Sequence, residues 1–299
     1  MIFTPDKNEI NQRLDKILLG HLPPDISRTE LQHLISKGSV TINGSPVKAS
    51  HRLKPGEEIK VELILKKELP KSKPEKIPLD IIYEDDHIIV INKPTGMVTH
   101  PGAGNQEHTL VNALLGHCFD IDGVGAAGRS GIVHRLDKDT SGVIIAAKNK
   151  AAHSKLSYQF KARKIKKEYV ALVNGVIDFD KGIIDAPLGR SINNRKKMAV
   201  TYNLGRPAVT KYEVVARFSQ YTFVRLYPQT GRTHQIRVHL AHLGYPIVGD
   251  KIYGKVQTQV RLMLHAQKLG VFHPVSNEYM EFEVPLPEDM EKIISDCSL

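Results

Sequence analysis

The segment His134–Gly142, with the sequence HRLDKDTSG, gathers charged and polar side chains directly after the apolar run Gly131–Val133. Asp137 follows Arg135 by two residues and precedes Lys138. Nearby cations favour the ionised form of an acid, so the pattern is typical of a reacting carboxylate or of an anion-binding loop. We therefore expect chemistry on a phosphate-bearing substrate, with a turn capped by the aspartate as the purely structural alternative.

A second carboxylate, Asp139, lies two residues after Asp137. Both would share one face if the segment were extended, and paired carboxylates serve as acid and base in glycosidases. A glycoside or nucleoside hydrolase is therefore one alternative function. Release of a free base would distinguish it from the function favoured below.

Four further blocks follow the same order as the signatures of a known family. The full set comprises Ile91–Gly96 with His100–Gly102, then HRLDKDTSG, Gly231–His239, Gly249–Asp250 and Leu264–Ala266. Together these blocks resemble pseudouridine synthases of the RluA/RluD family, over about residues 79–287. Several blocks in the right order are far more specific than a single motif.

This resemblance implies isomerisation of uridine to its C-glycoside in structured RNA. It assigns the reacting carboxylate to Asp137, its guanidinium partner to Arg237, and the aromatic ring against the target uracil to Tyr169. A guanidinium can grip a carboxylate bidentately and hold it ionised. The acid could add to the base, trap the sugar covalently or remove a ribose proton to give a glycal, and the sequence leaves these routes open.

The resemblance also implies a set of substrate-binding residues. Arg135 would occupy the space of the flipped nucleotide or contact a phosphate, and Leu264 would form an apolar floor under the base. Extrusion of a base from folded RNA costs a few kcal/mol, which such contacts help to offset. The full expected set is His134, Arg135, Leu264, Lys93, Arg232 and His234.

We expect no cofactor and no metal. The isomerisation is redox-neutral, and Gly102–Gly104 is too short for a dinucleotide or phosphate-binding loop. Three histidines, at 234, 239 and 242, lack the His-Glu-x-x-His pattern. Cys118 and Cys297 are the only two cysteines, too far apart for a metal-like spacing.

Composition favours an RNA partner. The 299 residues carry a formal net charge of +10, which suits a polyanion although it does not prove one. Few cysteines, no apolar span and no secretory signal indicate a cytoplasmic protein without membrane contact. We expect a monomer acting on large-subunit ribosomal RNA or pre-ribosomal particles, with transfer RNA as an alternative substrate. A noncatalytic RNA-binding factor remains a further alternative function.

A lysine- and proline-rich segment divides the chain. Residues 66–78 hold five lysines and three prolines, which is typical of an extended connector. We assign 1–66 to an amino-terminal domain, 67–78 to a linker and 79–299 to a catalytic domain. Two short helices, one capped by Ser27, and a hairpin at the Asn43-Gly44 turn are expected first. Their order resembles the S4 RNA-binding domain, in which Arg13, Arg28 and Lys37, with Lys48 and Arg52, would contact phosphates rather than form a merely solvated surface.

The elements that must position the catalytic residues are mostly strands. Short apolar or alternating runs predict strands at 81–83, 88–91, 143–147, 169–173, 212–215 and 223–227. Helices are expected at 109–117, 150–163 and 237–243. The spacing does not fit a regular doubly wound sheet, so we predict an α+β class. The family resemblance implies a long, bent, mostly antiparallel mixed sheet with a central cleft, plus the small α+β S4-like domain.

Overall fold

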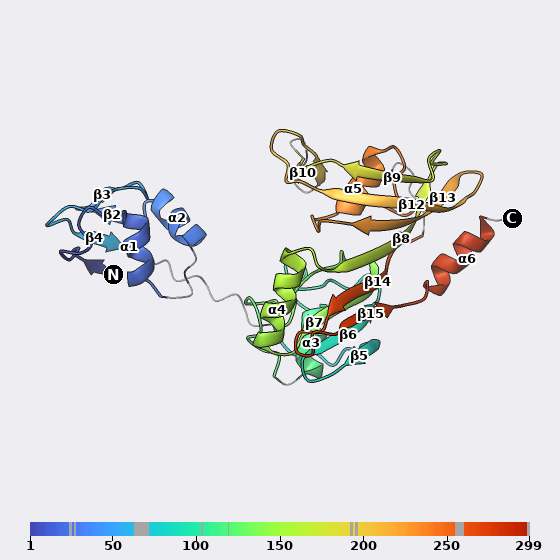
Figure 1. Ribbon diagram of the computed structural model, residues 1–299, viewed down its shortest axis with the longest axis horizontal. Coiled ribbons are helices and arrows are strands. Elements are labelled where there is room, and N and C mark those ends of the chain that lie inside the picture. The colour runs from blue at the N-terminus through green and yellow to red at the C-terminus, as the bar shows by residue number, and fades with distance from the viewer. Residues whose placement is uncertain are drawn as a thin grey trace. The chain divides into compact units, whose positions relative to one another are not determined.

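The chain forms two compact units, Met1–Leu69 and Pro70–Leu299 (Figure 1). This computed structural model describes residues 1–297 apart from 24–25, 27, 63–71, 103, 119, 192–193, 195–196 and 255–259. The expected helix cap Ser27 and the first part of the expected linker lie outside the described residues. Each unit is considered by itself.

The first unit contains the expected two helices and hairpin. Strands β2 and β3 are joined by Asn43 and Gly44, both with positive φ, at 48° and 77°. This is the conformation that a two-residue type I′ turn requires. Its elements are β1 (Ile2–Phe3), α1 (Leu14–His21), α2 (Arg28–Ser36), β2 (Val40–Ile42), β3 (Ser45–Pro46) and β4 (Ile59–Val61), with the strands in the order β1-β4-β2-β3.

The second unit is built on a nine-stranded sheet. Its order is β5-β6-β7-β14-β8-β13-β12-β9, with β15 paired to β14. Only β7 and β14 run parallel among these pairs, so the predicted mostly antiparallel mixed sheet is confirmed. The strands on this path are β5 (Ile81–Glu84), β6 (Ile88–Lys93), β7 (Ser141–Ala147), β8 (Lys166–Asn174), β9 (Lys181–Asp185), β12 (Val209–Arg217), β13 (Tyr221–Pro228), β14 (Leu264–Phe272) and β15 (Tyr279–Glu283).

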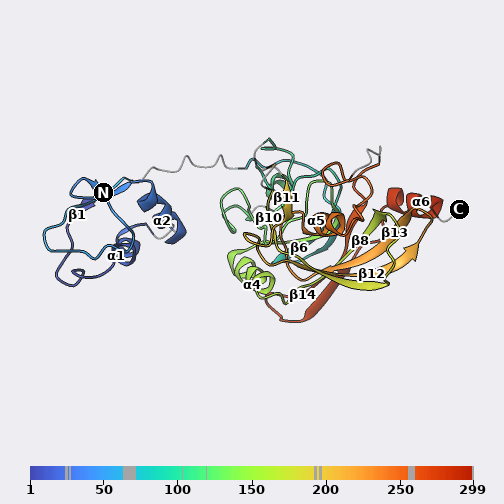
Figure 2. The ribbon, with the colours of Figure 1, turned by 90° about the horizontal axis from the view of Figure 1, so that it is seen from above.

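Helices cover parts of this sheet, and a two-stranded sheet stands apart from it (Figures 1 and 2). The predicted helix at 150–163 ends at Lys161, because Arg163 has a positive φ of 58° and cannot continue it. The helix expected to begin at Arg237 begins two residues earlier, after His234. The remaining elements are α3 (Leu110–His117), α4 (Lys150–Lys161), α5 (Gln235–His242), α6 (Glu288–Asp296), β10 (Leu188–Arg190) and β11 (Met198–Val200).

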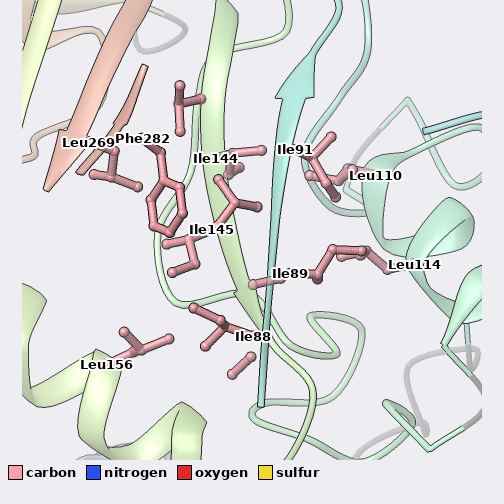
Figure 3. Close-up of a cluster of buried hydrophobic side chains, with 14 of the residues drawn as sticks. Ile88, Ile89, Ile91, Leu110, Leu114, Ile144, Ile145, Leu156, Leu269 and Phe282 are labelled. Carbon is pink, nitrogen blue, oxygen red and sulfur yellow. The ribbon is translucent and has the colours of Figure 1, made fainter. Parts of the chain in front are cut away.

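Strands β6 and β7 form the centre of one apolar core. Every residue of β7 is buried, and residues 88–91 of β6 are fully inaccessible. Such a continuous apolar run is expected when both faces of a sheet are covered. Figure 3 shows Ile89 and Ile91 beside Leu114 and Leu110 of α3, and Ile88 on the side of Leu156 in α4.

Part of the expected linker is packed against the catalytic unit. The side chain of Asn112 in α3 donates a hydrogen bond to the carbonyl of Lys73, and the amide of Glu75 donates to the Asn112 carbonyl. Residues 72–78 therefore do not form a free connector as expected. Thr109 and Asn112 form the capping box at the start of α3. The same capping box orients the Asn112 side chain, which binds the carbonyl of Lys73.

Candidate active site

The strand order brings three distant segments together at the middle of the large sheet. Ser141 at the end of the HRLDKDTSG loop is paired with His265 of β14, and Tyr169 of β8 is paired with Ala266. A cavity of about 620 Å³ lies there. Its walls contain most of the predicted site residues, namely His134, Arg135, Asp137, Tyr169, Arg232, His234, Arg237 and Leu264.

Gly142 fixes the loop against β14. Its φ is +114°, and a Cβ at this position would lie 2.1 Å from the carbonyl oxygen of Ala266. Only glycine fits such a close approach of two backbones. The glycine that ends HRLDKDTSG thus sets where Asp137 stands relative to β14.

Arg237 connects Asp137 to a second carboxylate. Its Nε and Nη2 donate to the two oxygens of Asp250 at 2.7 and 2.8 Å, whereas Nη1 reaches Asp137 Oδ2 at 3.4 Å. The predicted Arg237–Asp137 contact is present, but the bidentate grip expected for Asp137 is made with Asp250. The reason is geometric, since the Nε and Nη2 edge of the guanidinium, which offers two parallel N–H groups, faces the buried Asp250.

Asp250 is the residue whose role the sequence did not reveal. Burial alone would raise its pKa, yet the Arg237 hydrogen bonds and the amides of Ile252 and Tyr253 hold the pKa below its usual range. Asp250 is therefore ionised at neutral pH and lies behind Arg237. Its membership in the Gly249–Asp250 block was the only signal, and that block carried no spacing that would place it beside the arginine.

Tyr253 and His234 complete the wall around the guanidinium. The Tyr253 ring lies 5.3 Å below the centre of the Arg237 guanidinium, and its hydroxyl is hydrogen-bonded to His234 Nδ1 at 2.9 Å. His234 Nε2 lies 3.9 Å from Asp137 Oδ2. Burial lowers the pKa of His234, which favours a neutral imidazole although Asp137 opposes the shift. Tyr253 lies in none of the motif blocks, so the sequence carries no signal for this position.

Tyr169 and Leu264 offer an apolar surface beside Asp137. Leu264 is 3% exposed, and both side chains line the cavity. Burial, reinforced by the charge of Asp137, raises the pKa of Tyr169 above its ordinary value. The phenol is therefore protonated and uncharged. A neutral ring next to a carboxylate suits stacking against a base that approaches the acid.

The loop residues before Asp137 have different roles. His134 accepts a hydrogen bond from the amide of Ile145 and stacks on Phe160 at 4.5 Å between ring centroids. Burial lowers the pKa of His134 to about 3, so it is a neutral support of the cavity wall rather than a cation. Arg135 is exposed at the rim, with Nη1 3.3 Å from His100 Nε2.

Two residues lie outside the cavity lining. Lys93 is fully buried, and its Nζ donates to the carbonyls of Pro94, Met97 and Lys138. The expected substrate contact is thus replaced by support of the HRLDKDTSG loop, because the ammonium group is already surrounded by backbone. Asp139 is exposed, and its carbonyl accepts from the Thr95 hydroxyl.

Other cations border the cavity. Arg232 donates from Nε to the carbonyl of Pro207. Lys167 donates to the carbonyl of Thr230, and burial lowers the pKa of this lysine to about 8. The opening of the cavity is therefore positively charged at neutral pH, which suits an RNA backbone.

In the first unit, Asp15 partly neutralises the expected RNA-binding face. Arg13 makes two 2.9 Å hydrogen bonds to the buried Asp15, and Arg28 lies 3.6 Å from it. Arg13 and Arg28 remain 42% and 62% exposed in their side chains. Lys37 is exposed as well. These three cations therefore stay accessible to phosphates.

One group of possible metal ligands occurs in the described part of the chain. Ligand atoms of Glu84, His117 and Cys118 lie within 4.8 Å of one another. Glu84 is already paired with Lys148 and His117, both at 2.8 Å. The group therefore has a cation in place and lies apart from the cavity residues. No helix in the described ranges is long and apolar enough to cross a bilayer.

Comparison with known protein families identifies the class to which the two units belong. Residues 87–242 match the family described as RNA pseudouridylate synthase, and residues 12–59 match the S4 domain. The chain belongs to the RNA pseudouridylate synthase family. The predicted resemblance is thereby confirmed for both parts of the chain.

Relatives and solved structures agree. The chain is 44% identical to the RNA pseudouridine synthase YlyB of Bacillus subtilis, over 97% of this chain and 96% of that protein. It is 43% identical to the ribosomal large subunit pseudouridine synthase D of Pseudomonas aeruginosa, over 95% and 91% of the two chains. The structure of human RNA pseudouridylate synthase domain containing 4 aligns with a TM-score of 0.60 and 26% identity, over 73% of this chain and 92% of that one.

Proposed function

We propose that this protein converts specific uridines of large-subunit ribosomal RNA to pseudouridine, with Asp137 as the reacting carboxylate. One observation carries the assignment of the acid. Asp137 is the carboxylate that shares the cavity wall with Tyr169 and Leu264 and also contacts the buried Arg237. Relatives named as large-subunit synthases support the choice of RNA.

The proposed reaction detaches uracil from ribose and rejoins it through carbon. The N1–C1′ bond breaks, a C5–C1′ bond forms, C5 loses its proton and N1 gains one, so no oxidant or reductant is needed. Tyr169 stacks on the flipped base above Leu264 while Asp137 reacts beside it. Arg237 keeps Asp137 ionised and oriented, because a cation near a carboxylate favours its charged form.

The remaining parts of the chain have supporting roles in this proposal. Unit 1 binds RNA phosphates through Arg13, Arg28 and Lys37, and residues 79–299 carry the chemistry. Arg135 enters the space of the flipped nucleotide, and Arg232 contacts the backbone at the rim. We expect the enzyme to act as a monomer. Free RNA and pre-ribosomal particles in the cytoplasm are both candidate substrates.

The test is carbodiimide-dependent primer extension across ribosomal and transfer RNA from a deletion strain. The strain is complemented with wild type or with Asp137→Ala. Sites restored only by wild type support both the activity and the acid, and their location identifies the RNA. If no site differs between the two strains, the assignment of Asp137 fails and a noncatalytic RNA-binding role takes its place.

The hydrolase alternative finds little support in the cavity. A glycosidase-like mechanism needs two carboxylates facing one substrate. Asp139 is exposed and is not among the cavity-lining residues, and the second carboxylate near Asp137 is Asp250, which is buried behind Arg237. Appearance of free uracil during turnover would support the hydrolase function instead.

A further inference from the structure

A second cavity lies against a different face of α4 from the candidate active site. Its volume is about 650 Å³, and it lies open to solvent between α4 and the turn 272–277 that joins β14 to β15. Both views of the ribbon show α4 beside β14 (Figures 1 and 2). Two lysines, Lys155 and Lys164, line it, and the described residues of its lining include no acid. We call it the α4 groove.

Aromatic and apolar side chains are left in solvent along this groove. Tyr158 is 61% exposed and Val275 is 56% exposed. The ammonium of Lys164 lies 5.7 Å from the centre of the Tyr158 ring. An exposed aromatic ring next to cations is the combination that binds single-stranded nucleic acid, because a base stacks on the ring while phosphates meet the cations.

The groove is preformed rather than loose. The side chain of Gln159 in α4 both donates to the carbonyl of Phe272, at 2.7 Å, and accepts from its amide, at 2.9 Å. His273 Nδ1 accepts from the amide of Ser276, and its Nε2 is 2.9 Å from Asp85. The turn is thus fastened to the helix on one side and to β5 and β6 through Asp85 on the other. Little ordering remains to be done when a ligand binds.

Basic side chains join the groove to the candidate active site. Lys161 and Arg163 line the first cavity, whereas Lys155 and Lys164 line the second. An α-helix with its side chains is only about 10 Å across, so a strand leaving the first cavity can cross α4 within a few nucleotides. Positive charge is available along the whole crossing.

We propose that the α4 groove binds a single-stranded segment of the RNA substrate next to the modified uridine. One base stacks on Tyr158, and neighbouring phosphates contact Lys155 and Lys164. The inference rests on the function proposed above, and it adds a recognition site outside both the catalytic cavity and the S4 domain. The groove gives the enzyme a way to prefer target uridines with an unpaired flank.

The first test is kinetic and uses the full chain. The probe is a large-subunit ribosomal RNA transcript labelled with 5-tritiated uridine, which releases tritium when C5 loses its hydrogen. Lys155→Glu/Lys164→Glu should raise KM roughly tenfold and change kcat by less than about twofold, because these lysines neutralise phosphates in the binding step and not in the chemical step. The charge-matched control is Lys181→Glu/Lys292→Glu, on the exposed surfaces of β9 and α6. Equal KM values for the two double variants overturn the proposal.

The second test does not depend on turnover. Full-length Asp137→Ala protein is irradiated with an oligouridine of about 12 nucleotides, within the usual range of single-strand site sizes, that contains 4-thiouridine, and cross-linked peptides are identified by mass spectrometry. Adducts at Tyr158 or within residues 272–277 that disappear on adding Lys155→Glu/Lys164→Glu support the groove. Adducts confined to the catalytic cavity overturn it. Absence of tritium release by wild type would refute the proposed function. An adduct at Tyr158 would still show that the α4 groove binds single-stranded RNA.

Discussion

Arg237 is held by Asp250 in a two-point grip, and Asp137 receives only its third, longer hydrogen bond. The arginine is thus positioned from behind by a carboxylate that faces away from the substrate. Asp137 keeps its other oxygen uncommitted to Arg237. The reacting acid is thereby oriented without being locked into a bidentate ion pair.

Asp250→Asn should impair the positioning of Arg237 without weakening the binding of RNA. Loss of the buried charge leaves Arg237 less well oriented, and a displacement of about 1 Å near a reacting group costs on the order of 100-fold in rate. We expect kcat to fall by about that factor while RNA affinity stays within about threefold. The matched control is Asp289→Asn, which alters the more exposed bidentate pair with Arg261. Equal kcat values for the two variants would contradict the positioning role.

Asp137→Asn should abolish tritium release, whereas Asp139→Asn should retain it within about threefold. The reason is placement, since Asp137 lines the cavity and Asp139 does not. Both variants should bind the transcript like wild type in filter-binding assays. The reverse pattern of activity would move the catalytic assignment to Asp139.

Tyr169 should act through its ring rather than its hydroxyl. Tyr169→Phe keeps the stacking surface and should retain most activity, whereas Tyr169→Ala should lose about 1 to 3 kcal/mol of stacking energy, roughly five- to 150-fold in kcat/KM. Because burial raises the pKa of the phenol, activity of wild type should show no loss from its ionisation up to about pH 10. Equal losses in Phe and Ala variants would assign the hydroxyl a direct role.

The folded protein should lose stability in mild acid because His134 is protonated more readily in the unfolded chain. Its folded pKa is about 3, against about 6.5 in an unfolded chain. Between these values the unfolded chain binds a proton that the folded chain does not. The contribution of neutral His134 to the free energy of unfolding is therefore complete above about pH 6.5. This contribution falls as the pH drops toward about 3, by at most about 1.4 kcal/mol per pH unit.

Urea unfolding of His134→Gln at pH 7, 6 and 5 checks this dependence. The variant should show a shallower decline in unfolding free energy than wild type. His242→Gln, at an exposed position of α5, should follow the wild-type slope. If His134→Gln also follows that slope, protonation of His134 does not limit acid stability.

Removal of residues 1–66 should weaken RNA binding more than it slows the chemical step. The logarithmic salt dependence of affinity should become shallower by about 0.7 to 0.9 for each phosphate that the protein no longer neutralises. Saturating turnover on the same transcript should change by less than about threefold. Arg13→Ala/Arg28→Ala/Lys37→Ala in the full chain should reproduce much of the loss. If the salt dependence of RNA affinity is unchanged in both proteins, unit 1 does not contribute to substrate binding.

The sequence predicted those features that depend on local pattern. Asn43-Gly44 demands positive φ and forms the turn, and the apolar run at 88–91 predicts a strand, which lies within β6. The family resemblance, which the ordered motif blocks carry, named most of the residues that line the cavity. Strand β14 was missed because Lys268 and Gly270 interrupt its apolar pattern, although its first residues belong to a recognised block.

Pairings between distant charged groups could not be read in the same way. Nothing in the local sequence distinguishes Lys93, which is buried among three carbonyls, from a lysine that meets substrate. Likewise, the sequence paired Arg237 with Asp137 alone, and only the turn after residue 249 brings Asp250 within reach of Nε and Nη2 of Arg237. Such choices depend on tertiary geometry that residue type alone does not encode.

The place of β14 in the sheet also sets when this enzyme can become active during its own synthesis. β14 lies between β7 and β8 although it follows both in the chain, so the cavity wall is incomplete until Leu264 at the start of β14 has left the ribosome. Unit 1 is made entirely from the first 69 residues and can fold far earlier, as amino-terminal domains generally do. A nascent chain would therefore be able to hold RNA well before it can modify it.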